Sequence, residues 1–231
     1  MALFVAGAFA GSAWAQEKGE IVAVDGVNYE IISENLITNG SFDDGVNGWY
    51  QGSWVAAATA GKTVATEGGF DGGSYLTITA GGASDATNLR GKWQVEQGKK
   101  YLFRVYTSGS TPSSNNLQYS KLYASAEEGS ETSSIHQLIW PAAAGQTSNE
   151  WLKNEIVFDA TTSWLAYRTS WTSGAKLDGF FLAEVEIVEP DLSRVGDFNG
   201  SIVDLQDFVK QIAETYGDRD VYRYIEDGSV V

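Results

Sequence analysis

The stretch NLITNGSFDDGVNGWYQGSW, residues 35–54, decides the fold of this chain. It begins with an apolar pair, turns at Asn-Gly, and continues through a lone Phe and two carboxylates to Gly-Trp-Tyr. Asn-Gly and Asp-Gly pairs are strong turn signals. Such a stretch fits a structural corner, a metal-binding loop, the edge of a binding groove, or several of these together.

The composition is that of a turn-rich β protein. The chain has 231 residues, of which 43% are hydrophobic, and it is rich in Gly and poor in Pro. Runs rich in β-branched and aromatic residues alternate with Gly, Ser, Asn and Thr. We therefore expect an all-β domain, a two-sheet β-sandwich or jelly roll. The expected strands are 74–80, 92–97, 100–108, 118–128, 136–142, 150–160, 163–171 and 179–189.

Two shorter segments flank this domain. Alternating apolar runs on either side of Asp25-Gly26 predict an N-terminal β-hairpin. After Pro190 the apolar residues follow helical spacing, which predicts a short C-terminal helical tail with its helix at about 203–216. The predicted segments are a signal peptide at 1–15, the hairpin at 16–34, the jelly roll at 35–189 and the tail at 190–231.

The first fifteen residues, MALFVAGAFAGSAWA, predict export. They are apolar and small and end in Ala-Trp-Ala, as in the hydrophobic region and cleavage site of a secretory signal, although a basic start is missing. No other stretch approaches the ~20 apolar residues of a membrane span. The chain has no Cys, which excludes disulfides, Cys-ligated zinc and thiol catalysis. We expect a secreted or cell-surface protein, more typical of a bacterium than of an animal.

The charge and the single histidine argue against several functions. The formal net charge is −15 and no Lys/Arg run occurs, so nucleic acid and anionic membranes are not expected partners. His136 is the only His and lies in a strand-like run, which disfavours a Ser-His-Asp triad or a two-His metal site. P-loop, Rossmann and HExxH patterns are missing. We do not expect an enzyme.

One expected strand separates its side chains cleanly into two faces. Alternation over residues 100–108 puts Tyr101 and Phe103 on a core face and Arg104 and Tyr106 on the other. An aromatic ring offers an apolar plate to the C–H face of a sugar, and nearby polar groups bond its hydroxyls. The second face therefore has the side chains of a small polar ligand site, although aromatic residues are common in any strand.

The order of motifs resembles a known family. The pattern Asn-Leu-x-x-Asn-Gly-x-Phe-acid followed by Gly-Trp is similar to the start of carbohydrate-binding modules of families 4, 9 and 22. Later stretches are similar to strands of the same modules, and the similarity spans about residues 35–189. The resemblance implies a β-jelly roll that binds polysaccharide without cleaving it. The later stretches are GGSYLTI at 72–78, VEQGKKYLFRVYTSG at 95–109 and LDGFFLAEVEI at 177–187.

Strand geometry, rather than the motif, suggests the sugar contacts. We expect the sugar on the sheet face with Arg104 and Tyr106, with Arg168 echoing Arg104 on the strand at 163–171. Three aromatic candidates complete this predicted site: Trp54, Trp171 and Tyr50.

The remaining large side chains of the opening stretch are predicted to be structural. Trp49 belongs to the Gly-Trp pair of the fold signature, and Leu36 and Phe42 are expected to be buried.

The resemblance also implies a structural Ca²⁺, which such modules often hold beside the first and last strands. The matching positions are the Ser41 carbonyl, Asp43 and Asp178, with Asp71 as a further ligand. Calcium takes several oxygen ligands, including carboxylates gathered from turns. The alternative is that Asp43 caps a turn and Asp178 ends a strand.

The tail loosely resembles a dockerin repeat, which would attach the chain to a larger surface or enzyme assembly. Asp197, Asn199 and Asp207 are similar to a calcium loop followed by a helix, but the loop is about one residue short. Two other functions stay open for the whole chain. One is a structural or adhesive surface module without a sugar site, and the other is a small glycan-active enzyme with two carboxylates facing each other across a cleft.

Overall fold

The structure is a computed structural model, and it describes residues 18–79, 88–109, 120–141, 149–169 and 174–188. These residues fall into two compact units, each described by itself. The larger unit spans residues 34–184, and the smaller one contains, among the described residues, 18–33 and 185–188. No helix in the described part of the chain is long and apolar enough to cross a bilayer.

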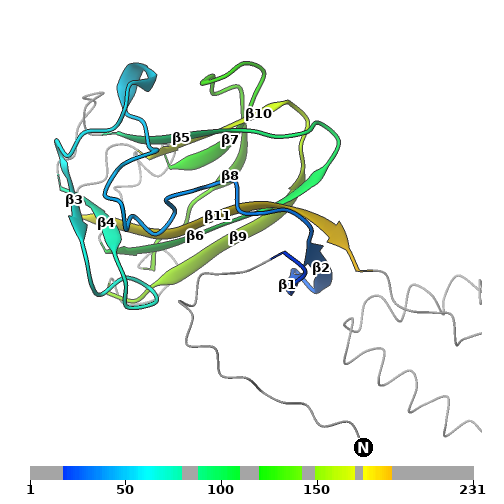
Figure 1. Cartoon of the computed structure of the whole chain (residues 1–231), viewed down its shortest axis with the longest axis horizontal. Coiled ribbons are helices and arrows are strands. Elements are labelled where there is room, and N and C mark those ends of the chain that lie inside the picture. Colours follow the sequence, from blue (N-terminus) through cyan, green and yellow to red (C-terminus); the bar gives the residue numbers. More distant parts are fainter. Residues whose placement is uncertain (1–17, 80–87, 110–119, 142–148, 170–173, 189–231) are drawn as a thin grey trace, which may run out of the picture. The chain divides into compact units, whose positions relative to one another are not determined.

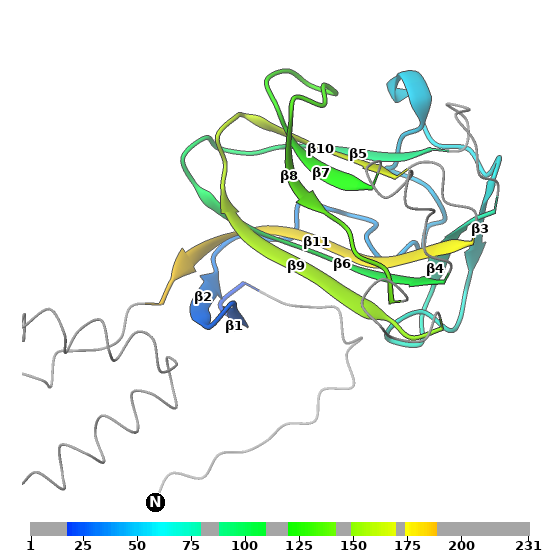
Figure 2. The ribbon, with the colours of Figure 1, turned by 180° about the vertical axis from the view of Figure 1, so that it is seen from behind.

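The larger unit is a sandwich of two antiparallel sheets, as the sequence predicts (Figure 1). Five strands form one sheet in the order β3–β4–β11–β6–β9, and four form the other in the order β5–β10–β7–β8. The first sheet contains β3 (Lys62–Ala65), β4 (Tyr75–Ile78), β6 (Lys100–Gly109), β9 (Leu152–Asp159) and β11 (Ala175–Ile187). The second contains β5 (Leu89–Gln94), β7 (Lys121–Ser125), β8 (Ser133–Gln137) and β10 (Trp164–Thr169). The two layers are also clear from behind (Figure 2).

The smaller unit is built on a β-hairpin. Strands β1 (Ile21–Val24) and β2 (Val27–Ile31) pair antiparallel, and β2 pairs in turn with the last residues of β11. The turn consists of Asp25 and Gly26, whose φ angles are 52° and 81°. Positive φ at both central residues is typical of the two-residue turns that match strand twist, which is why the sequence signal for this hairpin is strong.

The sandwich core is organised around the indole of Trp49, which is only 3% exposed. Its ring stacks on Phe42 at 5.3 Å between centroids and meets Phe180 edge-on at 4.6 Å. The indole N–H donates to the Asn39 carbonyl at 2.9 Å, which satisfies its one polar group. The predicted structural role of Trp49 and the burial of Phe42 are both confirmed.

The prediction that Leu36 is buried is wrong. Leu36 is 37% exposed, whereas the next residue, Ile37, is 4% exposed and lies in the core. The reason is the direction of the backbone, which is fixed by the Asn35 side chain. Its Oδ1 accepts from the N–H groups of Ile37 and Leu182, both at 3.0 Å. The Leu36 N–H also donates to the Leu182 carbonyl at 2.7 Å, so the segment follows β11 with Ile37 directed inward.

Several predictions lie outside the described residues. These are the signal segment at 1–15, the helix at about 203–216, and the dockerin-like positions Asp197, Asn199 and Asp207. They stay predictions.

The opening stretch approaches β11 so closely that Gly40 has no room for a side chain. Phe180 N–H donates to the Gly40 carbonyl at 3.1 Å, and a Cβ on Gly40 would lie 2.0 Å from the Phe180 carbonyl oxygen. We expect Gly40→Ala to lower the free energy of unfolding by about 3 kcal/mol, the upper end for overpacking, because a backbone atom cannot rotate away. Urea denaturation measures this change.

Gly91→Ala is the matched control for Gly40→Ala. Its Cβ would meet side-chain rings rather than a carbonyl: the half-buried ring of Trp93 at 2.2 Å and Cζ3 of Trp49 at 3.1 Å. Gly91→Ala should therefore cost less. Equal costs for the two variants would contradict the close approach of Gly40 as the constraint.

Candidate functional site

The predicted sugar-binding residues lie on opposite outer faces of the sandwich. On β6, Phe103 and Val105 are in the core, so Arg104 between them points out of the five-stranded sheet. On β10, Tyr167 is in the core and Arg168 points out of the four-stranded sheet. Arg104 and Arg168 therefore cannot contact the same sugar unit. Trp171 lies outside the described residues.

The face with Arg104 and Tyr106 is largely covered. Arg104 forms an ion pair with Glu155, and these side chains are only 11% and 8% exposed. Tyr106 is 9% exposed because Phe70 stacks on it, with ring centroids 3.6 Å apart. Burial raises the pKa of the Tyr106 phenol, and the nearby charge of Arg104 partly opposes the shift. Neither ring face nor guanidinium is presented openly here.

The outer face of the four-stranded sheet gathers cations. Arg168 lies directly opposite Arg90 of β5 and Lys121 of β7 in the strand register. Two residues along, Ala166 lies opposite Lys92 and next to Tyr123 on the other side. Because alternate residues of a strand share a face, these side chains emerge together.

The opening stretch adds two aromatic rings to this face. Tyr50 and Arg90 exchange two backbone hydrogen bonds of 2.8 Å, so the chain after Trp49 continues the sheet beside β5. Alternation then buries Trp49 and turns Tyr50 outward, where Lys92 Nζ lies 4.4 Å from its ring centroid. This is within the range of a cation–π contact.

Trp54 contacts a glycine and two cations. Arg90 Cζ lies 5.1 Å and Lys92 Nζ 5.9 Å from its ring centroid. A Cβ on Gly129 would lie 3.0 Å from both Nε1 and Cε2 of the indole, so the Gly129 backbone packs directly against the ring. Trp54 also has φ 57°, a left-handed conformation that costs a residue with a side chain about 1–2 kcal/mol. Packing therefore fixes this ring where it positions the cations.

Two carboxylates from the β7–β8 connection neutralise part of this charge. Glu131 lies between Arg168 Nη1, at 3.1 Å, and Arg90 Nη1, at 3.6 Å. Lys92 Nζ pairs with Glu128 at 2.7 Å, and Glu128 is 53% exposed. We refer to Tyr50, Trp54, Arg90, Lys92, Arg168 and Glu131 as the cation–aromatic cluster.

Sequence reasoning places three members of this cluster among the candidates and misses the other three, Arg90, Lys92 and Glu131. Arg90 and Lys92 lie on β5, which begins at Leu89, three residues before the expected strand. In residues 89–92, Leu89 and Gly91 are buried, whereas Arg90 and Lys92 point outward. This alternation is the sequence signal that identifies the two cations.

Asp178 is a buried carboxylate on the five-stranded sheet. It is fully buried, and its oxygens accept from the N–H groups of Phe70 at 2.9 Å and Gly179 at 2.6 Å. Burial raises its pKa to about 7; the two backbone donors oppose the shift, and the charges of Asp71 and Asp43 add to it. This carboxylate therefore has other acids near it and backbone donors as its hydrogen-bond partners.

Oxygen atoms converge beside Asp178 at Gly69. A Cβ on Gly69 would lie 2.5 Å from Asp178 Oδ2, 2.7 Å from the Ser74 carbonyl oxygen and 2.8 Å from the Gly73 carbonyl oxygen. Oxygen donors around a small space suit a hard cation such as calcium. Within the described ranges, no three His, Cys, Asp or Glu side chains are grouped as metal ligands. A cation here would be held by Asp178 and carbonyl oxygens, with Asp71 and Asp43 outside this group.

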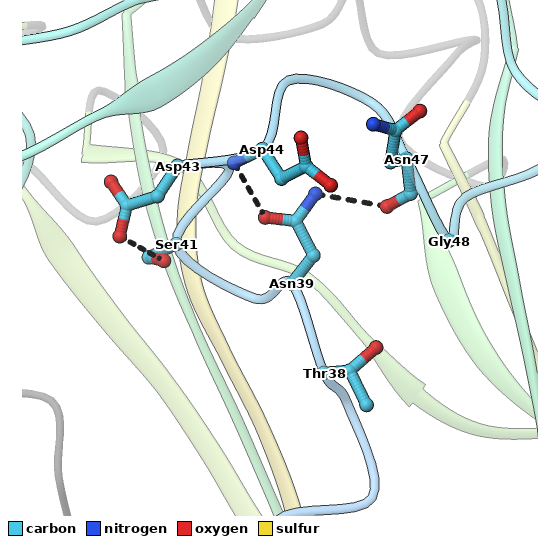
Figure 3. A pocket seen from close by; sticks show the side chains of 7 residues that line it. All are labelled: Thr38, Asn39, Ser41, Asp43, Asp44, Asn47 and Gly48. Atoms are coloured by element: carbon cyan, nitrogen blue, oxygen red, sulfur yellow. Dashed lines mark hydrogen bonds between the residues drawn. The ribbon is translucent and has the colours of Figure 1, made fainter.

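The side chains of Ser41 and Asp43 lie in a neighbouring open pocket of the opening stretch (Figure 3). Ser41 Oγ donates to Asp43 Oδ2 at 2.8 Å. Asn39 holds the loop by accepting from the Asp44 N–H at 3.2 Å and donating to the Asn47 carbonyl at 2.9 Å. The side chains of Asn39, Ser41 and Asp43 are thus hydrogen-bonded within this pocket.

No protein-family model matches the sequence, and the search of curated proteins finds no match. Similar solved structures include a family 61 carbohydrate-binding module in complex with β-1,4-galactotriose. It is 14% identical with a TM-score of 0.41 and covers 66% of this chain and 99% of that one. A family 4 module is 15% identical with a TM-score of 0.39, covering 64% and 99%. The family 22 xylan-binding domain of Paenibacillus barcinonensis Xyn10C is 17% identical with a TM-score of 0.42, covering 67% and 97%.

The raised pKa of Asp178 predicts that stability falls as pH rises in buffer free of divalent ions. The folded state binds this proton more tightly than the unfolded chain, in which the carboxyl has its ordinary pKa of 3.8. The contribution is therefore fully present below about pH 4 and is lost as pH rises through about 7. Urea denaturation at intervals between about pH 4 and pH 8 measures the slope.

The variant Asp178→Asn separates the pH-dependent contribution of Asp178 to stability from that of the other acids. The amide offers one oxygen for two backbone donors, so the variant should be less stable overall. Its stability should nevertheless depend less steeply on pH, because the side chain stays neutral. Parallel slopes for the two proteins would show that Asp178 is not the titrating group.

Proposed function

We propose that the chain is a non-catalytic carbohydrate-binding protein whose ligand lies on the outer face of the four-stranded sheet. The observation that carries this proposal is the convergence of Tyr50 and Trp54 with Arg90, Lys92 and Arg168 on one face. Sugar sites combine apolar contact area with a few placed hydrogen-bonding groups. Export, predicted from residues 1–15, would suit a polymer met outside the cell.

The cluster supplies the hydrogen-bonding groups, and rings beside it on the same face supply apolar area. Guanidinium groups present several N–H donors in a fixed plane, which suits pairs of oxygens on one sugar ring. The half-buried rings of Tyr123 and Trp164 lie on the same face and add apolar area beside the cations.

The opposite face offers less to a ligand. Tyr106 already has Phe70 stacked on it, and the Arg104 guanidinium is occupied by Glu155 in a mostly buried pair. A sugar there would first have to displace Phe70. The four-stranded face therefore supports binding better than the face first predicted from Arg104 and Tyr106.

We also propose that Ca²⁺ binds where oxygens converge at Gly69. Asp178 would hold the ion together with the carbonyls of Gly73 and Ser74, and Asp71 and Asp43 would add negative charge nearby. A divalent ion would supply the positive charge that this buried carboxylate lacks. In this role calcium stabilises the fold and takes no part in sugar contact.

Two arginines give a matched test of the binding face. Arg168→Gln should weaken binding to a glycan ligand by at least about tenfold, since hydrogen bonds to charged groups are worth about 1.5–3 kcal/mol. Arg104→Gln, which breaks an equivalent Arg–Glu pair on the opposite sheet, should change affinity by less than about twofold. Affinity electrophoresis against a broad panel of polysaccharides identifies the ligand, and calorimetry then gives the affinities.

A second pair of variants, at two tyrosines, tests the same face if an arginine variant does not fold. Tyr50 lies under Lys92, and Tyr75 of the five-stranded sheet lies under Lys176 at 5.2 Å. Tyr50→Ala should weaken binding and Tyr75→Ala should not. Loss of glycan binding in Arg104→Gln or Tyr75→Ala would place the site on the five-stranded sheet. No binding to any polysaccharide of the panel would favour a structural or adhesive module.

Calcium should raise the melting temperature. An ion at 100 times its Kd stabilises the fold by about 2.7 kcal/mol, which is a shift of about 5–10 °C for a domain of this size. Asp178→Asn should abolish the shift, and Asp25→Asn in the hairpin turn should retain it. Differential scanning calorimetry with calcium and with a chelator tests this, and an unchanged melting temperature would overturn the calcium proposal.

A further inference from the structure

We infer that the cation–aromatic cluster selects polysaccharides that carry carboxylates, that is, polymers containing uronic acids. This inference rests on the proposed function, because it concerns the ligand of the same face. It adds the charge of the ligand, because neutral and acidic sugars can both stack on an aromatic ring.

The first support is the sign of the local charge. The chain has 15 Lys and Arg against 30 Asp and Glu. Four of these cations, Arg90, Lys92, Lys121 and Arg168, nevertheless occupy neighbouring positions on one sheet face. The β7–β8 connection brings Glu127, Glu128 and Glu131 to this region, so among the described residues four cations stand against three acids. An acidic chain thus presents a locally positive surface.

The second support is what the aromatic rings contact. A neutral sugar is best received by an open ring face. Here Arg90 and Lys92 lie over Trp54, Lys92 lies over Tyr50, and the Gly129 backbone packs on Trp54. The two rings therefore serve to hold cations in place, and a ligand reaching them meets positive charge first.

The third support is that the cluster already holds a carboxylate. The Glu131 side chain lies between two guanidinium groups, and all three side chains are at most 24% exposed. Charge interactions in such partly buried places are screened less than those on an open surface. Glu128, by contrast, is half exposed at the edge of the cluster and pairs only with Lys92 among the described contacts. A uronate carboxylate can replace Glu128 on Lys92 without opening the core.

The net charge of the chain would favour a neutral polymer over an acidic one. A net charge of −15 repels a polyanion, so an acidic polymer should be disfavoured unless specific contacts hold it. Preference for the acidic polymer therefore cannot arise from the net charge of the chain.

The test compares one polymer in two charge states. Polygalacturonate, alginate and glucuronoxylan are each titrated into the full chain by calorimetry, before and after chemical reduction of their carboxyl groups to alcohols. Reduction keeps the backbone and linkage of each polymer. We expect at least one uronate polymer to bind at least about tenfold more tightly than its reduced form. A sulfated galactan is the arm that separates carboxylates from anions in general.

Two variants assign the preference to the cluster. Lys92→Ala should remove the preference, and Lys153→Ala, which breaks a Lys–Glu pair of the same 2.7 Å length on the other sheet, should retain it. Glu128→Gln removes the competing carboxylate and should raise uronate affinity several-fold while leaving the reduced polymer unchanged. A merely structural role for Glu128 would not produce a gain.

The outcomes separate this inference from the proposed function. Equal or tighter binding of reduced or other neutral polymers overturns the carboxylate inference and leaves carbohydrate binding standing. Tighter binding of the sulfated polymer than of any uronate also overturns it. No binding to any polymer overturns both. Equal losses in Lys92→Ala and Lys153→Ala would show that the cluster is not the source of selection.

Discussion

The bulge in β11 is the constraint on which the rest of the structure depends. The register with β6 shifts between Asp178 and Phe181, and Gly179 there adopts φ 61°. An extra residue in a strand re-aims the side chains on either side of it. Phe180 consequently enters the aromatic core and bonds the backbone of Gly40, while Asp178 is turned to the oxygen atoms beside Gly69. One irregularity thus joins the opening stretch, the core and the buried acid.

The same opening stretch connects this constraint to the opposite sheet. Gly40 fixes its start against β11, Trp49 fills the core, and Tyr50 pairs with β5 at Arg90. The rings of Tyr50 and Trp54 then lie where they meet Arg90 and Lys92. The stretch that identifies the fold therefore also supplies Tyr50 and Trp54 to the candidate binding face. The chain changes from core to surface between Trp49, which points inward, and Tyr50, which points outward.

The sequence predicts where strands occur better than which strands pair with one another in a sheet. All eight strands expected in the sandwich overlap observed ones, and in the described part of the sandwich only the four-residue β3 is missed, because a run this short carries little pattern. Alternation correctly turns Arg104 and Arg168 away from the core, but it does not tell which sheet a strand joins. Alternation alone therefore predicts the two residues on one face, whereas they lie on opposite faces of the sandwich. The Gly73 and Ser74 carbonyls could not be foreseen either, since every residue has one.

The cluster is hard to explain as a device for stability. Burying two arginines around one glutamate costs desolvation of three charges, and replacing such groups by packed apolar residues is often neutral or stabilising. Trp54 adds a left-handed backbone conformation, and Arg90 Nε is buried without a hydrogen bond among the described residues. A sandwich that already has a continuous aromatic core gains little from these contacts. Strained and unsatisfied groups that gather at one place are characteristic of functional sites.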